Sequence, residues 1–198
     1  MMTQSTVSTL KFIRWAAWGL ILMLTAVSGY LMLSPEAPKA AIGGPFAMQS
    51  STGARIDLAV AEKGKPHAVF FGFTQCPDVC PTTMFEITQL LRKMDPKTKD
   101  FRVYFVSVDP ERDTASLLKD YLSAFDDRII GMVGSAEELA NVARQYRASY
   151  SKVPTPSGYT MNHTATLYLF DRNGEFFGTL DPNDAESAKI AKMERLLR

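Results

Sequence analysis

After residue 42, hydrophobic and polar positions alternate in blocks that predict strands and helices in turn. Short apolar runs rich in aromatic and β-branched residues, such as HAVFFGF at 67–73, are typical of buried strands. Longer segments with apolar residues three or four positions apart predict amphipathic helices. The predicted strands cover 46–49, 54–58, 67–73, 101–108, 129–133, 164–170 and 175–180, and the predicted helices cover 81–92, 114–124, 136–146 and 185–198.

Turn and capping signals separate these elements. The sequence SSTG predicts a hairpin turn at Thr52-Gly53, DRNG predicts a second hairpin at 171–174, and Ser135 with Glu138 forms a capping box. Residues 147–162, RASYSKVPTPSGYTMN, fit neither period, so a long irregular loop of functional or mobile character is expected there. This order predicts an α/β domain with a thioredoxin-like three-layer fold, in which helices cover both faces of a mixed, mainly parallel central sheet.

The N-terminal region has a different pattern, because 15–33, WAAWGLILMLTAVSGYLML, contains no charged residue. A helix of this length spans about 28 Å, close to the hydrocarbon thickness of a bilayer. We therefore expect one transmembrane helix at 15–33, a cytoplasmic N-terminus at 1–14, a linker at 34–42 and a single domain at 43–198. A cleaved signal peptide is the alternative and gives the domain the same topology.

The charges beside this segment predict its orientation. Lys11 and Arg14 precede it, whereas Glu36 and Lys39 follow it. The positive-inside rule then places the domain in the periplasm, anchored in the inner membrane, or in the mitochondrial intermembrane space of a eukaryote. A net charge of +1 from 22 basic and 21 acidic residues gives no field for nucleic acid, so no nucleic-acid partner is expected.

Both cysteines of the chain lie in CPDVCP at 76–81. Because each is followed by proline, this segment is predicted to be a loop, with Cys80 as cap residue and Pro81 as the first position of the next helix. A helix N-terminus favours the thiolate. Three uses stay open: a structural disulfide, which closes too short a loop to stabilise much, a redox pair, and a metal clip.

The histidines favour the metal clip. His67 is expected to be an exposed or half-buried residue at a strand end, whereas His163 is expected to begin the strand beside the cysteine loop. Two thiolates and one imidazole form a soft donor set, which suits three-coordinate Cu(I) and holds Cu(II) with added ligands. A structural role for His163 is the alternative. Asp78 and Asp109 are candidate secondary ligands, and for both an ordinary turn role is the alternative.

The chain resembles the Sco/SenC family of copper-binding proteins that take part in the assembly of cytochrome c oxidase. The resemblance rests on four segments of the sequence: IGGPF at 42–46, GKPHAVFFGFTQCPDVCP at 64–81, VSVDPERDT at 106–114 and NHTATLYLFDRNGEF at 162–176. It implies a thioredoxin-like fold, a single membrane anchor and a copper site formed by Cys76, Cys80 and His163. Where the family commonly has an acidic residue before the histidine, this chain has Asn162.

These observations lead to a functional expectation with two alternatives. The expected function is a copper metallochaperone, more a carrier than an enzyme, whose partners are the copper-bearing subunit of a cytochrome oxidase or another copper chaperone. The first alternative is a thiol-disulfide oxidoreductase that reduces the oxidase cysteines before metallation. The second is a copper or redox sensor that signals through partner binding.

Overall fold

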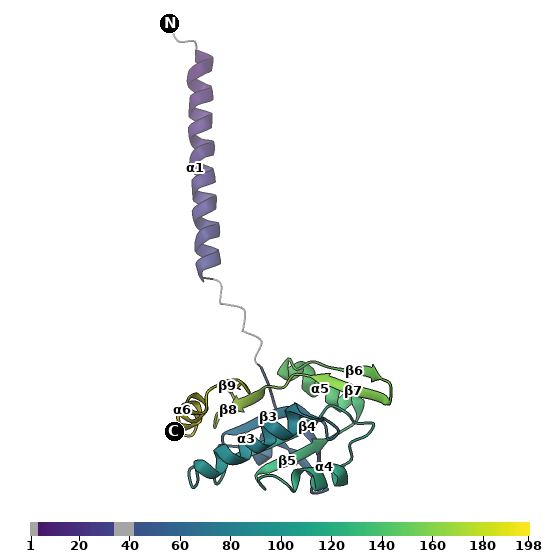
Figure 1. Ribbon diagram of the computed structural model, residues 1–198. Coiled ribbons are helices and arrows are strands. Elements are labelled where there is room, and N and C mark those ends of the chain that lie inside the picture. Colours follow the sequence, from purple (N-terminus) through teal and green to yellow (C-terminus); the bar gives the residue numbers. More distant parts are fainter. Residues whose placement is uncertain (1–3, 34–41) are drawn as a thin grey trace. The chain divides into compact units, whose positions relative to one another are not determined.

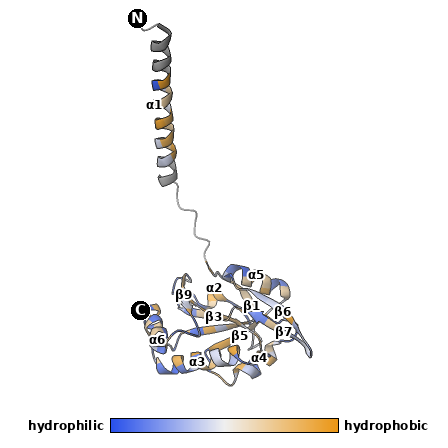
Figure 2. Cartoon of the chain, turned by 45° about the horizontal axis from the view of Figure 1, so that its top comes forward, coloured by the Kyte–Doolittle hydropathy of each residue, from blue (hydrophilic) through white to orange (hydrophobic). Residues whose placement is uncertain are grey.

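The computed structural model describes residues 4–33 and 42–198. The chain divides into two compact units, Met1–Ala40 and Ala41–Arg198. In the first unit helix α1 spans Gln4–Leu33, and the part of it coloured in Figure 2 is mainly hydrophobic. No helix within the described residues combines the length and hydropathy required of a membrane span. The predicted linker lies, except for Ile42, outside the described residues, and the anchor stays a prediction.

A seven-stranded sheet forms the centre of the second unit (Figure 1), with the strand order β2-β1-β5-β4-β3-β8-β9. The strands are β1 (Ala47–Ser50), β2 (Arg55–Asp57), β3 (His67–Gly72), β4 (Arg102–Ser107), β5 (Ile129–Val133), β8 (Leu167–Phe170) and β9 (Phe176–Leu180). The three central strands β5, β4 and β3 are parallel. The outer strands all pair antiparallel. The predicted mixed sheet is confirmed, but the expectation that it is mainly parallel is wrong.

Helices cover both faces of this sheet. They are α2 (Leu58–Ala61), α3 (Val79–Lys93), α4 (Ala115–Leu122), α5 (Ala136–Tyr146) and α6 (Glu186–Leu196). Ion pairs join α3 to α6 directly, for example Lys93 to Glu186 at 2.8 Å. Contacts from neighbouring residues of β3 lead to α4 on one face and to α5 on the other, so the predicted layered α/β architecture is confirmed.

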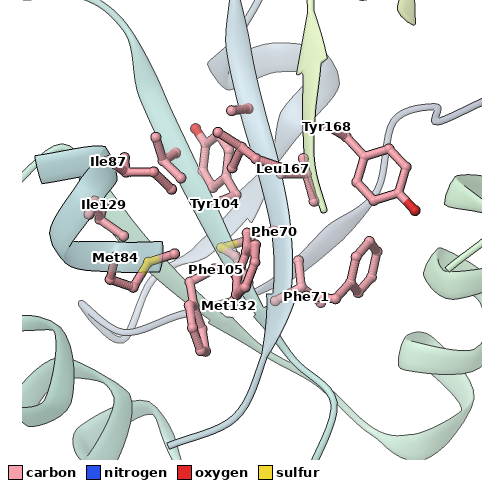
Figure 3. Close-up of a cluster of buried hydrophobic side chains, with 14 of the residues drawn as sticks. Phe70, Phe71, Met84, Ile87, Tyr104, Phe105, Ile129, Met132, Leu167 and Tyr168 are labelled. Atoms are coloured by element: carbon pink, nitrogen blue, oxygen red, sulfur yellow. The ribbon is translucent and has the colours of Figure 1, made fainter. Parts of the chain in front are cut away.

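Alternating aromatic residues of β3 attach these layers to the sheet. Phe70 faces Phe105, which contacts Tyr121 of α4, whereas Phe71 packs edge-on against Tyr146 of α5. Figure 3 shows Phe70 and Phe71 on the two sides of the strand. Because successive residues of a strand point to opposite faces, the unbroken apolar run of β3 supplies both halves of the core.

The segment expected to be an irregular loop is a β-hairpin. Its strands β6 (Tyr150–Thr155) and β7 (Gly158–His163) pair antiparallel from Tyr150↔His163 to Thr155↔Gly158. They form a separate two-stranded sheet (Figure 1), which we call the histidine hairpin. The prediction of a loop is wrong because β6 is exposed along most of its length, so no alternation of apolar and polar residues marks it.

Other local predictions have definite outcomes. The turn at Gly53, with φ of 91°, and the turn at Gly174, with φ of 75°, have the positive φ that glycine tolerates. The capping box of Ser135 and Glu138 is present, with both hydrogen bonds made. The strand predicted from residue 164 begins only at Leu167.

Two neighbouring leucines of α4 test where the core lies. Leu118 is fully buried over Gly131 of β5, whereas Leu117 is 39% exposed. Leu118→Ala is expected to lower the free energy of unfolding by about 2–5 kcal/mol, because it leaves a cavity in the core. Leu117→Ala should change it by less than about 1 kcal/mol. Urea unfolding followed by circular dichroism measures both, and equal losses would contradict this account of the packing.

Candidate metal centre

The two cysteines flank the start of helix α3. Strand β3 ends at Gly72, residues 73–78 form the segment we call the cysteine loop, and α3 begins at Val79 with Asp78 as its N-cap. Cys76 thus lies in the loop and Cys80 in the first helical turn. The prediction that Cys80 caps a helix beginning at Pro81 is wrong by two residues. The proline is tolerated because the first N–H groups of a helix have no intrahelical partner.

Asp113 holds the cysteine loop against the central sheet. Its carboxylate accepts hydrogen bonds from the backbone N–H of Thr74 at 3.2 Å and from the Thr74 hydroxyl at 2.6 Å. The hydroxyl of Ser107, the last residue of β4, also donates to it at 2.5 Å. The carboxylate is buried, so these charge-assisted bonds are shielded from water. The loop is therefore fixed to the carboxyl end of β4.

His163 reaches the cysteines from a different element than expected. It is the last residue of β7 in the histidine hairpin and does not begin a strand of the central sheet. Its ring contacts Phe73 of the cysteine loop edge-on, with centroids 5.7 Å apart, and also Phe70 of β3 at 6.2 Å. The aromatic rings position the imidazole beside the sulfurs.

The three donor atoms converge. The Sγ atoms of Cys76 and Cys80 and a ring nitrogen of His163 all lie within 4.8 Å of one another. The Cys80 Sγ is 3.5 Å from Nε2 of His163. In a three-coordinate ion with bonds of about 2.0–2.3 Å, the donors are about 3.5–4 Å apart, so the arrangement fits one soft metal ion after a small contraction.

The second ring nitrogen of His163 has a partner of its own. Nδ1 lies 3.1 Å from the carbonyl oxygen of Thr164. A carbonyl only accepts, so Nδ1 carries the proton and Nε2 presents its lone pair to the sulfurs. Metal-binding histidines usually have such an outer partner. Asn162 is exposed and pairs across the hairpin with Ser151, so the backbone fills this role without it.

The two thiols differ in their acidity. A hydrogen bond from Cys80 is the main cause that holds the pKa of Cys76 well below its usual range, against the opposing effect of burial. The same sulfur–sulfur hydrogen bond, followed by burial, raises the pKa of Cys80. The backbone N–H of Cys80 points at the Cys76 sulfur from 3.4 Å. Cys76 is therefore the thiolate of the pair, and Cys80 holds the proton.

The two candidate secondary ligands have other partners in the structure. Asp78 is exposed, and its carboxylate accepts a hydrogen bond from the Thr82 hydroxyl at 3.4 Å. Asp109 is 1% exposed, and it is engaged by Arg112 and by the Tyr159 hydroxyl. Neither belongs to the group of converging donors in the described part of the chain. Their role as ligands stays a prediction.

His67 and Met161 have packing roles in the structure. His67 is buried at the start of β3, contrary to the expectation of an exposed or half-buried residue, and its ring stacks on Phe170 at 5.1 Å. His67 is at the amino end of β3, whereas the cysteines follow its carboxyl end, so His67 is not at the cysteine site. Met161 is 8% exposed within the hydrophobic core, which is the packing role usual for methionine.

Sequence reasoning missed the polar residues that connect the loops of this site. Arg112 contacts both the cysteine loop and the histidine hairpin, through Gln75 and through the carbonyl of Tyr159. Arg112 falls within VSVDPERDT, one of the segments that carry the family resemblance. Membership of this segment was the one signal in the sequence that pointed to Arg112. Its contact with Tyr159 could not be foreseen, because the hairpin that brings Tyr159 to Arg112 was not predicted.

The inequality of the thiols gives a testable reactivity. At pH 6, Cys76 of the reduced chain is expected to react with iodoacetamide, because its lowered pKa leaves it a thiolate, whereas an ordinary cysteine is less than about 1% thiolate. Cys80→Ala should lower the Cys76 rate at pH 6, since it removes the hydrogen bond that stabilises the thiolate. Mass spectrometry of the alkylated peptide measures both rates. A Cys76 rate that rises only above pH 8 would contradict the assignment.

Comparisons with known proteins can now be set beside this geometry. Residues 34–198 match the SCO1/SenC family. The mitochondrial SCO1 homolog of Homo sapiens is 34% identical over 164 residues, which are 81% of this chain and 54% of that protein. The mitochondrial SCO1 homolog 1 of Arabidopsis thaliana is 40% identical over 147 residues, 72% of this chain and 43% of that protein. The chain thus spans about half the length of these curated relatives.

Solved structures give the same family. The structure of Bradyrhizobium japonicum ScoI with copper bound is 43% identical, superposes with a TM-score of 0.72, and covers 79% of this chain and 99% of its own. Yeast Sco1 with copper bound is 31% identical with a TM-score of 0.71, over 78% of this chain and 87% of its own. Since the family match includes every residue of the second unit that the structure describes, the chain belongs to the SCO1/SenC family.

Proposed function

We propose that this chain is a membrane-anchored copper metallochaperone that delivers copper to the copper centre of a cytochrome oxidase. The convergence of Cys76, Cys80 and His163 within 4.8 Å carries the proposal. Its donor set of two sulfurs and one imidazole nitrogen is soft and suits Cu(I), with Cu(II) held when further ligands are added. Structures of family relatives with copper bound support the choice of metal.

The burial of the two sulfurs indicates an order of transfer. Cys76 is half-buried and is the thiolate, whereas Cys80 is fully buried behind it. A thiolate of the partner therefore meets the copper on the side of Cys76. In each exchange one bond from copper to this chain breaks as one bond to the partner forms, and the oxidation state of copper does not change. Cys80, which is least accessible, is then the last donor to leave.

The site of action follows from the predicted anchor. Residues 15–33 would hold the chain in the inner membrane, and the domain would face the periplasm or, in a eukaryote, the intermembrane space. The copper-bearing subunit of the oxidase, or another copper chaperone, is the partner that the family relationship favours.

Thiol-disulfide exchange is the second candidate function, and the unequal thiols favour it. The Cys76 thiolate would attack a disulfide of the partner and form a mixed disulfide, with one partner sulfur leaving as thiolate. Cys80 would lose its proton, attack Cys76 and release the second partner sulfur. The partner disulfide gains two electrons, and the pair Cys76–Cys80 is oxidised. This reaction needs both sulfurs but has no use for His163.

Replacing His163 separates the two functions. His163→Ala is expected to weaken copper binding by at least about 100-fold, because it removes a direct ligand and outer-sphere changes alone cost 10- to 100-fold. Competition with a chromophoric copper chelator measures the affinity of the reduced chain. The rate of dithiol exchange with a model disulfide should change less than about threefold, since both sulfurs remain.

Asn162→Ala is the matched control, because Asn162 is the exposed neighbour of His163 on the same strand. Its copper affinity is expected to equal that of the unaltered chain. Unchanged affinity in His163→Ala would refute the assignment of the third ligand. Normal copper delivery to the oxidase in cells that carry His163→Ala, with thiol reduction retained, would favour the oxidoreductase.

Membrane extraction tests the anchor. The full chain is expected to stay with the membrane fraction in alkaline carbonate, because an uncharged segment of this length partitions into the bilayer. A chain that begins at residue 42 should be released into the supernatant. Immunoblotting of both fractions gives the result, and release of the full chain would contradict the anchor.

A further inference from the structure

Arg112 joins three separate segments around the candidate metal centre. It follows β4, and its Nε donates to the carboxylate of Asp109 in the same loop. Its Nη1 donates at 2.9 Å to the Gln75 side chain, next to Cys76 in the cysteine loop, and at 2.9 Å to the carbonyl oxygen of Tyr159 in β7. One guanidinium therefore bonds the cysteine loop, the β4–α4 loop and the histidine hairpin together.

Tyr159 closes this arrangement from the hairpin. Its hydroxyl donates to Oδ1 of Asp109 at 2.8 Å, and its ring lies under the guanidinium, with the Arg112 Cζ 3.8 Å from the ring centroid. We call Arg112, Asp109 and Tyr159 the clamp. Each member contacts both others, by an ion pair, a hydrogen bond or a cation–π contact. The clamp is therefore a closed ring of three interactions.

Burial makes the clamp strong. The side chain of Asp109 is 1% exposed and that of Arg112 is 21% exposed, so water screens their charges poorly. Removing one partner of a buried pair leaves the other charge uncompensated, which is strongly destabilising. A guanidinium also has a planar fork of donors that a lysine ammonium lacks. Arg112→Lys keeps the charge but loses this geometry.

The histidine hairpin depends on such contacts for its position. Among the described strands, β6 and β7 pair only with each other. A single two-stranded hairpin is marginally stable by itself, so contacts with the rest of the domain must hold it. His163 lies at the end of this hairpin, whereas both cysteines belong to the body of the domain. The distance from the imidazole to the sulfurs is therefore set by how the hairpin is docked.

We propose that Arg112 and Tyr159, joined through Asp109, are positioning residues that hold His163 against the cysteine pair and so make the third copper ligand available. They act through the hairpin, since Tyr159 lies on the same strand as His163, and through Phe73, whose ring is 6.0 Å from Arg112 and 5.7 Å from the His163 ring. The effect of this positioning on copper binding rests on the proposed function, because it determines how many donor atoms are available to copper.

A metal-free measurement tests the positioning directly. The chain has only two histidines, so the imidazole nitrogens of the reduced full chain in detergent can be assigned by long-range proton–nitrogen NMR with His67 as internal reference. Tyr159→Leu and Arg112→Lys are expected to shift the His163 Nε2 resonance toward that of a solvent-exposed imidazole, because its contact with Cys80 is lost. Tyr159→Phe keeps the ring over the guanidinium and should give a smaller shift.

Lys152→Met is the matched control. Lys152 lies on β6 of the same hairpin, 4.6 Å from the Tyr159 ring, and forms an exposed ion pair with Glu111. Exposed pairs contribute little, so this variant should keep the His163 spectrum of the unaltered chain. Retention of that spectrum in both Tyr159→Leu and Arg112→Lys would overturn the proposal, whatever the copper result. Thermal unfolding shows whether each variant is folded. If Tyr159→Leu and Arg112→Lys do not fold, the shift of the His163 resonance in Tyr159→Phe decides the test.

Copper binding tests the consequence. Tyr159→Leu and Arg112→Lys are expected to lose about 10- to 100-fold in copper affinity, the range for residues that orient a ligand, and to lose the imidazole nitrogen signal in pulsed EPR of the Cu(II) form. In a His163→Ala background, Tyr159→Leu should cause no further loss, because the clamp acts through that histidine. An equal loss in both backgrounds would refute the proposal.

Absence of copper binding by the unaltered chain would refute the proposed function instead. The NMR result would then decide the positioning.

Discussion

The contact between the histidine hairpin and the cysteine loop is the constraint on which the candidate centre depends. The sulfurs are fixed to the central sheet through β3, α3 and the hydrogen bonds of Asp113. The imidazole of His163 lies on a separate two-stranded sheet, the histidine hairpin. A donor set divided in this way exists only while the two parts are docked. The partly buried clamp around Arg112 and the aromatic contacts of His163 supply that docking.

Within the docked arrangement, the electrostatics give the two sulfurs different tasks. The hydrogen bond between them leaves the charge on half-buried Cys76 and the proton on buried Cys80. A reduced site without metal therefore presents one accessible thiolate, the form that binds copper or attacks a disulfide. The same feature serves both candidate functions, and for that reason His163, which only metal binding requires, is the residue that separates them.

The elements that the sequence predicted are those whose burial leaves a pattern. HAVFFGF is buried on both faces and reads as a continuous apolar run, and the capping box of Ser135 marks its helix by chemistry alone. The hairpin has no such sequence pattern, because most of β6 faces solvent and the strand contains Pro154. Proline is tolerated in a strand with an unpaired edge. Cys76 and Cys80 were identified from their loop, whereas the approach of His163 depends on tertiary docking that no local pattern contains.

The histidine itself shows how the backbone can take over a role expected of a side chain. An acidic residue before a metal-binding histidine would orient the ring by accepting a hydrogen bond from its second ring nitrogen. Asn162 carries no negative charge to strengthen such a bond. The ring instead lies with Nδ1 3.1 Å from the Thr164 carbonyl, which is supplied where the chain leaves β7. A carbonyl accepts the same hydrogen bond and cannot be removed by substitution of a side chain. The tautomer that directs Nε2 toward the sulfurs is thus determined by the path of the backbone, so the orientation of the imidazole depends on the fold of the hairpin and not on residue 162.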